Sequence, residues 1–337
     1  MNYFITGGTG FIGTHLTNLL HEVHPEAKIY NLDIIEPGTP LPTVKNYKPA
    51  LRKGEEHAAT FIYCDVRQTI ELEKVNITPD DVIFNFAAVH RTPGHPDPAY
   101  FETNIRGAEN VCAFAERHGI RKIVFTSSIA PYGAAEELKE ETTLPMPNTP
   151  YGISKLVAEK IHQTWQAGGE GRQLTIVRPG VVFGRGENGN FTRLYWGIRG
   201  HKFMYPGRKD TIKACIYVKE LVRFMLYRLE HHDSGVELYN CCYEPAYTIE
   251  HIVESMKRVT NMKVKVPFMP GWLIMTAAGI AGALGSPMGI CPARVRKLQI
   301  STNICGKKLS ASGYRFHYTF EEALADWYKD NGNLYLQ

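Results

Sequence analysis

Three residues of this sequence have the types and the spacing for acid–base chemistry at a substrate oxygen. Tyr151 and Lys155 stand four positions apart in Tyr151-Gly-Ile-Ser-Lys155, so a helix there places both side chains on one face. A phenol has a pKa of about 10, and an adjacent ammonium lowers it so that the phenol can shuttle a proton at neutral pH. Ser128 ends an upstream apolar run, from which its hydroxyl could orient the substrate oxygen. The three residues therefore predict a catalytic site.

A glycine-rich segment near the N-terminus predicts a dinucleotide site. The run Gly7-Gly8-Thr9-Gly10-Phe11-Ile12-Gly13 follows a β-branched run and opens a helical pattern. Its glycines allow a tight turn and a close approach to a pyrophosphate, whose charge meets the helix N-terminus. The residues expected to bind the cofactor are Gly7, Gly10, Phe11, Ile12 and Gly13.

Asp33 indicates which dinucleotide binds. It ends the second predicted strand, where a carboxylate accepts hydrogen bonds from the ribose hydroxyls and repels a 2′-phosphate. No Arg or Lys lies within residues 31–35 to neutralise such a phosphate, so NAD is favoured over NADP. Asp65, which Val66 follows, ends the third predicted strand and either reaches the adenine or caps a helix.

The elements expected to position these residues alternate between strands and helices. The expected strands are 2–6, 28–32, 60–63, 82–86, 122–126 and 174–178, and the helical patterns lie near 11–21, 98–118 and 151–166. This alternation predicts an α/β fold, a Rossmann-type doubly wound parallel sheet, with ligands outside the carboxyl ends of the strands. We expect residues 1–178 to form the NAD-binding domain. Residues 179–337, with frequent Gly and Pro at their start, would be a smaller and mainly substrate-binding region, some segments of which return to the sheet.

Together these motifs resemble the extended short-chain dehydrogenase/reductases, specifically the branch of NAD-dependent nucleotide-sugar epimerases and dehydratases. The resemblance covers nearly the whole chain and is looser in its C-terminal half. Besides the motifs above, it rests on Asn85-Phe86-Ala87-Ala88, Thr103-Asn104-Ile105-Arg106-Gly107, Phe125-Thr126-Ser127-Ser128, Tyr132-Gly133 and Val177-Arg178-Pro179.

The resemblance implies roles for the catalytic and cofactor residues. Tyr151 would be the acid/base, and Ser128 would be the catalytic hydroxyl. Lys155 would bind the nicotinamide ribose and lower the pKa of the phenol. Ala87 and Ala88 would line the dinucleotide.

On the substrate side, the segment Asn188-Gly189-Asn190-Phe191 resembles the substrate-contacting loop of the family. Asn190 would therefore hold a phosphate of the sugar nucleotide. Lys213 stands where relatives often have an Arg for the diphosphate. His90, at the rim of the nicotinamide site, either faces the substrate or is an ordinary loop histidine. Asn104 would be structural near the active site.

The residues after Ser128 distinguish between reaction types. Family dehydratases and decarboxylases usually carry an acid there, whereas this chain has Ile129 and Ala130, so removal of water lacks its proton donor. The sequence therefore predicts a nucleotide-sugar 4-epimerase that acts by transient oxidation at C4. One alternative is an NAD-dependent dehydrogenase or 4-ketoreductase of a keto-sugar or of a bulkier sterol- or lipid-like alcohol. Another is a non-catalytic, cofactor-sensing binding protein, which the intact Ser128, Tyr151 and Lys155 disfavour.

Composition argues against other classes. The chain has 337 residues and a net charge of +4 without a long basic run, which disfavours nucleic-acid binding. Its seven scattered cysteines lack metal-ligand spacing, and a strand pattern begins at Asn2. These features predict a cytoplasmic protein with reduced thiols and no metal.

The apolar stretch 272–284 is too short to predict a membrane span, and it is either a buried helix or a weak contact with a membrane surface. The family's dimer bundle of the two helices that begin near 98 and 151 implies a homodimer.

Overall fold

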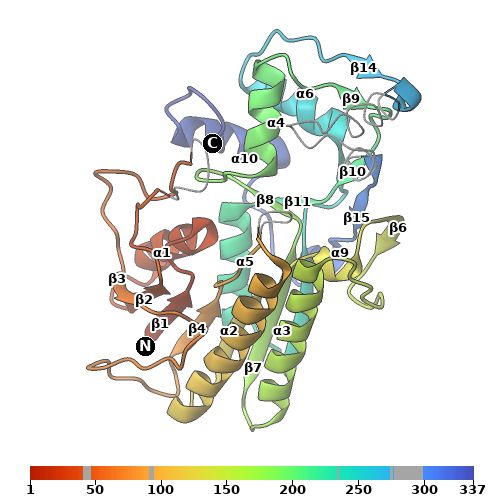
Figure 1. The fold of residues 1–337 in the computed structure, drawn as a ribbon. Helices are drawn as coiled ribbons and strands as arrows, with labels where there is room; N and C mark the ends of the chain where they lie inside the picture. The colour runs from red at the N-terminus through yellow and green to blue at the C-terminus, as the bar shows by residue number, and fades with distance from the viewer. Residues whose placement is uncertain (41–46, 91–94, 234, 274–275, 277–298) are drawn as a thin grey trace.

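Seven parallel strands form the central sheet of the protein (Figure 1). The computed structural model describes residues 1–40, 47–90, 95–233, 235–273, 276 and 299–337. The sheet has the order β12-β7-β5-β4-β1-β2-β3. Its strands are β1 (Asn2–Thr6), β2 (Lys28–Asp33), β3 (Thr60–Tyr63), β4 (Val82–Asn85), β5 (Lys122–Thr126), β7 (Gln173–Pro179) and β12 (Val236–Cys241).

Helices cover both faces of this sheet because successive strand residues point to opposite sides. Tyr3 and Ile5 of β1 are buried in one core cluster with side chains of α1 (Phe11–Val23) and α5 (Val218–Glu230). Phe4 lies in the cluster on the other face, with side chains of α2 (Asp97–His118) and α3 (Pro150–Ala167). The arrangement confirms the predicted Rossmann-type fold.

Shorter elements gather at one end of the sheet, where Figure 1 shows α4, α6 and α10. Their shared core contains Phe183, Phe191, Val253 and Trp327. The short strands are β6 (Ala135–Lys139), β8 (Val181–Phe183), β9 (Tyr205–Pro206), β10 (Ile212–Lys213), β11 (Cys215–Tyr217), β13 (Tyr247–Thr248), β14 (Phe268–Met269) and β15 (Thr302–Ile304). The helices are η1 (Ala130–Tyr132), α4 (Asn190–Arg199), α6 (Ile249–Val259), α9 (Lys307–Ala311) and α10 (Phe320–Asp330).

The six strands expected from sequence all occur, with ends within one residue of the prediction. Two elements from beyond residue 179 belong to the central layers, because β12 pairs with β7 and α5 packs beside α1. Of the apolar stretch 272–284, only Trp272, Leu273 and Thr276 lie within the described residues. Within the described ranges, no helix is long and apolar enough to cross a membrane.

Candidate active site

The glycine motif forms a tight turn between β1 and α1. Gly7 has a φ of 68°, which favours glycine, and a Cβ there would lie 2.8 Å from the Ala87 nitrogen. A Cβ on Gly13 would lie 2.5 Å from the Gly8 carbonyl oxygen. The Gly10 amide donates to the Gly7 carbonyl at 3.1 Å, which closes the turn. The turn therefore brings the glycines against Ala87, the first residue of the predicted Ala87-Ala88 contact.

Asp33 is anchored to this turn. The Thr9 hydroxyl donates to Asp33 Oδ2 at 2.7 Å, and the Ile34 amide donates to Oδ1 at 2.8 Å. The carboxylate therefore stands at the carboxyl end of β2, beside the glycine turn. A backbone cradle with no room for side chains, next to a fixed carboxylate, fits the pyrophosphate and ribose of NAD.

Asp65 and Val66 follow β3 in a turn rather than in a helix. The Asp65 carboxylate accepts hydrogen bonds from Arg67 Nε, at 2.9 and 3.0 Å, and from Arg67 Nη2, at 2.6 Å; the Arg67 guanidinium lowers the pKa of Asp65. Val66 is buried, and its Cγ2 would lie 3.0 Å from a Cβ at Gly107 of α2. In the structure Asp65 thus holds Arg67, and its contact with adenine stays a prediction.

Ser128 and Tyr151 meet at the N-terminus of α3. Thr149 caps this helix by accepting from the Gly152 amide at 3.1 Å. A Cβ on Gly152 would lie 2.6 Å from the Ala130 carbonyl oxygen, so glycine is needed where the helix approaches the segment after Ser128. Burial raises the pKa of Tyr151 to about 12, and the interaction with the Ser128 side chain opposes that rise.

Lys155 lies one turn further along α3 and is only 3% exposed. Its Nζ donates to the Thr126 carbonyl at 2.7 Å and lies 4.8 Å from the centre of the Phe125 ring. Burial lowers the pKa of Lys155 to about 7, against the opposing charge of Glu159. The lowering of the Tyr151 pKa by Lys155 stays a prediction, because in this structure the ammonium donates to the Thr126 carbonyl.

A buried ion pair that sequence reasoning missed lies next to Lys155. Glu159 accepts from Arg178 Nε at 2.8 Å and Nη2 at 2.6 Å, and both side chains are almost fully buried. Glu159 Oε1 also accepts from the Ser127 hydroxyl at 2.5 Å. The Arg178 guanidinium stacks 4.6 Å from the centre of the Tyr132 ring. The sequence spacing shows only that Glu159, four positions after Lys155, shares its helical face; it does not indicate the partners Ser127 and Arg178.

Asn104 links the helix that carries Tyr151 to the loop that carries His90. Its Oδ1 accepts from the Val89 amide at 2.8 Å, and its Nδ2 donates to the Val89 carbonyl at 3.0 Å. The same Nδ2 donates to Ser154 Oγ at 2.9 Å. These contacts fit the structural role expected for Asn104. His90 itself is exposed.

The two other predicted substrate residues lie on the shorter elements. Asn190 begins α4, is exposed, and accepts from Arg193 Nη2 at 2.7 Å. Lys213 of β10 donates to the Ile300 carbonyl at 2.8 Å, and burial lowers its pKa to about 8. In the described part of the chain, these hydrogen bonds go to Arg193 and Ile300 rather than to Ser128, Tyr151 or Lys155.

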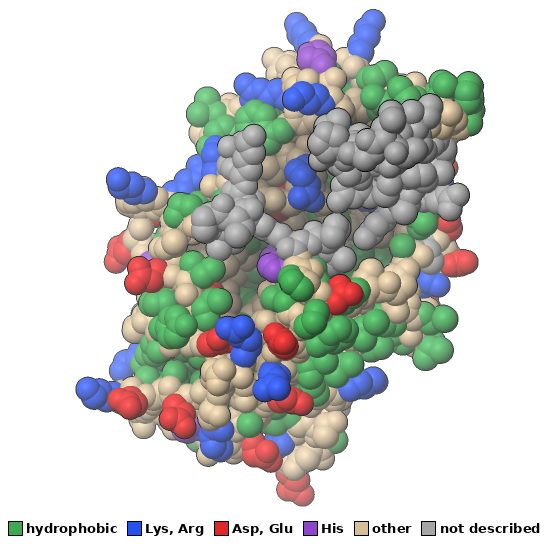
Figure 2. Space-filling view, viewed as in Figure 1, with side chains coloured by type: hydrophobic (Ala, Val, Ile, Leu, Met, Phe, Trp, Pro, Cys, Tyr) green, Lys and Arg blue, Asp and Glu red, His purple; other side chains and the backbone are tan. Residues whose placement is uncertain are grey.

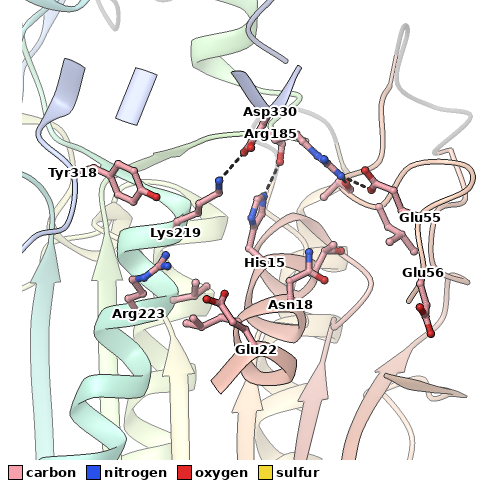
Figure 3. A pocket seen from close by; sticks show the side chains of 15 residues that line it. His15, Asn18, Glu22, Glu55, Glu56, Arg185, Lys219, Arg223, Tyr318 and Asp330 are labelled. Carbon is pink, nitrogen blue, oxygen red and sulfur yellow. Dashed lines mark hydrogen bonds and ion pairs between the residues drawn. The ribbon is translucent and has the colours of Figure 1, made fainter. Parts of the chain in front are cut away.

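A separate cavity of about 330 Å³ lies between α1, α5 and α10 (Figure 3). Two cations in its lining have partners: Arg185 pairs with Glu55, and Lys219 Nζ lies 2.8 Å from Asp330. His15 Nε2 bonds to the Arg185 carbonyl at 2.8 Å, and burial lowers the His15 pKa to about 4. The described residues that line this cavity include none of the predicted catalytic residues.

Comparisons with known proteins agree with this geometry. The sequence model of the NAD dependent epimerase/dehydratase family matches residues 3–242. An N-acetyl-alpha-D-glucosaminyl-diphospho-ditrans,octacis-undecaprenol 4-epimerase of Escherichia coli O157:H7 is 30% identical, over 96% of this chain and 93% of that protein. A UDP-glucose 4-epimerase of Lacticaseibacillus casei is also 30% identical, over 80% of this chain and 85% of its own length. Among solved structures, UDP-glucuronic acid 4-epimerase from Bacillus cereus in complex with NAD has a similar fold, with a TM-score of 0.74 at 19% identity, over 99% of this chain and 100% of that one.

Proposed function

Because the chain belongs to the NAD-dependent epimerase/dehydratase family, we propose that it inverts C4 of a sugar that is linked through a diphosphate, with nucleotide sugars as the first substrate class. Membership makes it an NAD-dependent enzyme of the extended short-chain dehydrogenase/reductase type, as the sequence predicted. The observation that carries the proposal is the interaction of Ser128 with the half-buried Tyr151, where Ile129 and Ala130 follow Ser128 instead of an acid.

The buried carboxylate next to this pair supports epimerisation over dehydration. Glu159 accepts hydrogen bonds from Ser127 and from two nitrogens of Arg178, so both of its oxygens are already engaged within the protein and it is not placed to serve a departing hydroxyl. Redox at C4 needs only a hydride acceptor and an acid/base group at the oxygen. The site has a residue for the second role in Tyr151.

The proposed roles of the chain's residues follow from their places. The glycine turn and Asp33 would hold NAD, with Ala87 against the turn. When bound, NAD supplies an acceptor for the C4 hydride, which returns to the opposite face of the sugar. Tyr151 removes the proton of the C4 hydroxyl and returns it, and Ser128 orients that oxygen. Lys155 would bind the nicotinamide ribose at the N-terminal part of α3.

A second substrate candidate is a sugar linked through a diphosphate to a polyprenol. The Escherichia coli relative, whose name specifies such a substrate, is similar over nearly the full length of both chains, including the loosely matching C-terminal part. Both candidates share a sugar and a diphosphate, for which Asn190 and Lys213 are the proposed contacts, with His90 facing the sugar. They differ in the group beyond the diphosphate.

A homodimer through α2 and α3 is part of the proposal. Ile153 and Val157, one turn apart on α3, are 40% and 36% exposed, although they are apolar. Helices α2 and α3 also lie side by side on one face of the sheet (Figure 1). Light scattering on the purified protein tests the dimer.

A cytoplasmic location is proposed because the six described cysteines are free thiols, five of them buried.

The function is tested by incubating the purified enzyme with UDP-, GDP-, CDP- and dTDP-sugars and with a short-chain polyprenyl diphosphate sugar. The expected product has unchanged mass and a changed NMR coupling pattern at C4, and Tyr151→Phe strongly slows its formation. Loss of one water would overturn the proposal. A two-hydrogen mass change coupled to added cofactor would establish the dehydrogenase or reductase alternative instead.

A further inference from the structure

One end of the molecule carries exposed apolar side chains on two segments that a short strand pair holds together. Strands β9 and β14 pair in parallel, with Phe268 opposite Tyr205, and the Gly207 amide donates to the Met269 carbonyl at 2.9 Å. The exposed apolar residues on these segments are Met204 (36%), Phe268 (50%), Trp272 (70%) and Leu273 (40%). These four residues are called the β9–β14 surface below.

Lysines lie on the same two segments. Residues 262–266 alternate, with Met262, Val264 and Val266 packed on the core and Lys263 and Lys265 exposed. Lys202, just before Met204, is also exposed. Within the residues that the structure describes, none of these three lysines forms an ion pair, whereas the neighbouring cations Arg208 and Lys209 are paired with acids.

Figure 2 shows the same segregation on the face it presents. Basic and hydrophobic side chains occupy the upper end of the molecule, where Figure 1 places α4, α6 and β14, and they also occur lower down, whereas most acidic side chains of this face lie below that end. Exposed Trp and Phe rings together with unpaired lysines are the composition of surfaces that insert into the headgroup region of a negatively charged bilayer. The charge is wrong for a second copy of the same surface, which would set lysines against lysines.

We propose that the β9–β14 surface, with Lys202, Lys263 and Lys265, docks the enzyme onto an anionic phospholipid bilayer. Its aromatic rings enter the headgroup layer, and its lysines bind lipid phosphates. Binding of this kind is reversible, and it weakens as salt screens the lysines.

The docking surface lies close to Lys213, so docking would bring a membrane-borne diphosphate substrate near this residue. A Cβ on Gly207 would lie 2.9 Å from Gly271 Cα and 2.7 Å from Gln299 Nε2, so the two segments abut residue 299. The carbonyl of the next residue, Ile300, accepts from Lys213 Nζ. The docking surface therefore adjoins the residue assigned to the diphosphate. This use rests on the proposed function and favours its polyprenyl diphosphate substrate, whereas the docking itself does not depend on catalysis.

Sedimentation with vesicles tests the docking on the full-length protein. The wild type is expected to sediment with phosphatidylcholine vesicles that contain phosphatidylglycerol, to bind less at high salt, and to bind weakly to phosphatidylcholine alone. Phe268→Ser with Trp272→Ser is expected to weaken binding roughly 10- to 100-fold, because two anchoring rings are lost. Lys263→Glu with Lys265→Glu is expected to weaken it on the order of 10-fold and to flatten the salt dependence.

Lys28→Glu with Lys122→Glu is the matched charge control. These lysines begin the parallel strands β2 and β5, and therefore lie at the amino edge of the sheet. All three double variants are expected to keep wild-type turnover of a water-soluble nucleotide sugar, which separates failure of docking from failure of the proposed function.

Three results would overturn the proposal. The first is a wild type that does not sediment with the anionic vesicles. The second is a folded aromatic variant, or a folded Lys263 and Lys265 variant, that binds as the wild type does. The third is light scattering in which the aromatic variant changes the oligomeric state, because the surface would then be an interface between copies of the chain.

Discussion

Lys155 and Glu159 lie one turn apart on α3 and bind consecutive residues of the segment that leads to Ser128. Lys155 Nζ donates to the Thr126 carbonyl at 2.7 Å, and Glu159 accepts from the Ser127 hydroxyl at 2.5 Å. One helical face therefore holds the carboxyl end of β5 at two adjacent points. Ser128, the next residue, is thereby presented to Tyr151.

Removal of the Glu159 charge is expected to destabilise the protein. In Glu159→Gln, the buried Arg178 guanidinium loses its counterion, and the free energy of unfolding should fall by about 3 to 5 kcal/mol. Denaturant unfolding measures the change. Asp80→Asn, which breaks the exposed pair of Asp80 with Arg121, is the control and should cost less than about 1 kcal/mol. Equal losses of unfolding free energy in the two variants would show that the buried pair stabilises the protein no more than the exposed pair does.

Tyr151→Phe is expected to lower turnover by roughly 10² to 10⁴, the range for loss of a positioned acid/base group. Its folding and NAD affinity should stay near wild type, because only the hydroxyl is removed. Steady-state kinetics and calorimetry provide both values. Tyr132→Phe is the matched control: it removes a buried hydroxyl that donates to Asn240 at 2.9 Å, so it should cost stability of about 1 kcal/mol and little turnover. Near-normal activity of Tyr151→Phe would remove Tyr151 from the mechanism.

Lys155→Met is expected to stabilise the fold in a pH-dependent way. The pKa of Lys155 falls to about 7 in the folded protein, from about 10.4 in the unfolded chain. Below pH 7 both states are protonated, so burial of the ammonium destabilises the folded state in full. Between these two values the unfolded state binds more protons, and the stability of the wild type rises with pH.

The gain in unfolding free energy from Lys155→Met should therefore be largest near pH 6 and should shrink toward pH 10 by about 4 to 5 kcal/mol. Denaturant unfolding at several pH values measures it. Exposed Lys28→Met should show no such trend. A constant difference across the whole range would mean that the Lys155 pKa is not lowered.

Asp33→Asn is expected to reduce the preference for NAD over NADP by on the order of 10-fold or more, because the charge that repels a 2′-phosphate is gone. Absolute affinity should fall as well, since Thr9 donates to this carboxylate through both its hydroxyl and its amide. Titration calorimetry with both cofactors measures the ratio. Asp65→Asn removes the same charge from a carboxylate that Arg67 already neutralises, and should leave the ratio nearly unchanged. If both variants change the ratio equally, Asp33 does not read the ribose.

The sequence was sufficient to place on their strands and helices those candidate site residues whose positions depend on local spacing. The glycine turn, Asp33 and the helical pair Tyr151 and Lys155 each combine a short motif with one strand or helix, so periodicity located them. The contact of Ser127 with Glu159 and that of Glu159 with Arg178 join three separate elements, and no spacing within one element specifies them.

The substrate side was harder to predict for a related physical reason. Lys213 belongs to a two-residue strand, β10, whose partner β15 lies far along the chain, so no hydrophobic period marks either strand. The Lys213 ammonium bonds to Ile300, a neighbour of β15, which only the tertiary fold reveals. The surface formed by Phe268 and Trp272 with Met204 likewise could not be predicted, because only the β9–β14 pair brings these segments together.

The edge position of β12 has a consequence for synthesis of the chain. Residues 236–241 pair along the whole of this strand with β7, which carries Arg178. A ribosome finishes the glycine motif and the catalytic residues long before it delivers β12. Until then the nascent sheet presents β7 as an open edge, a template for pairing with other chains. The order of translation and the order of the strands therefore disagree, and in the interval between the synthesis of β7 and that of β12 this edge is unprotected.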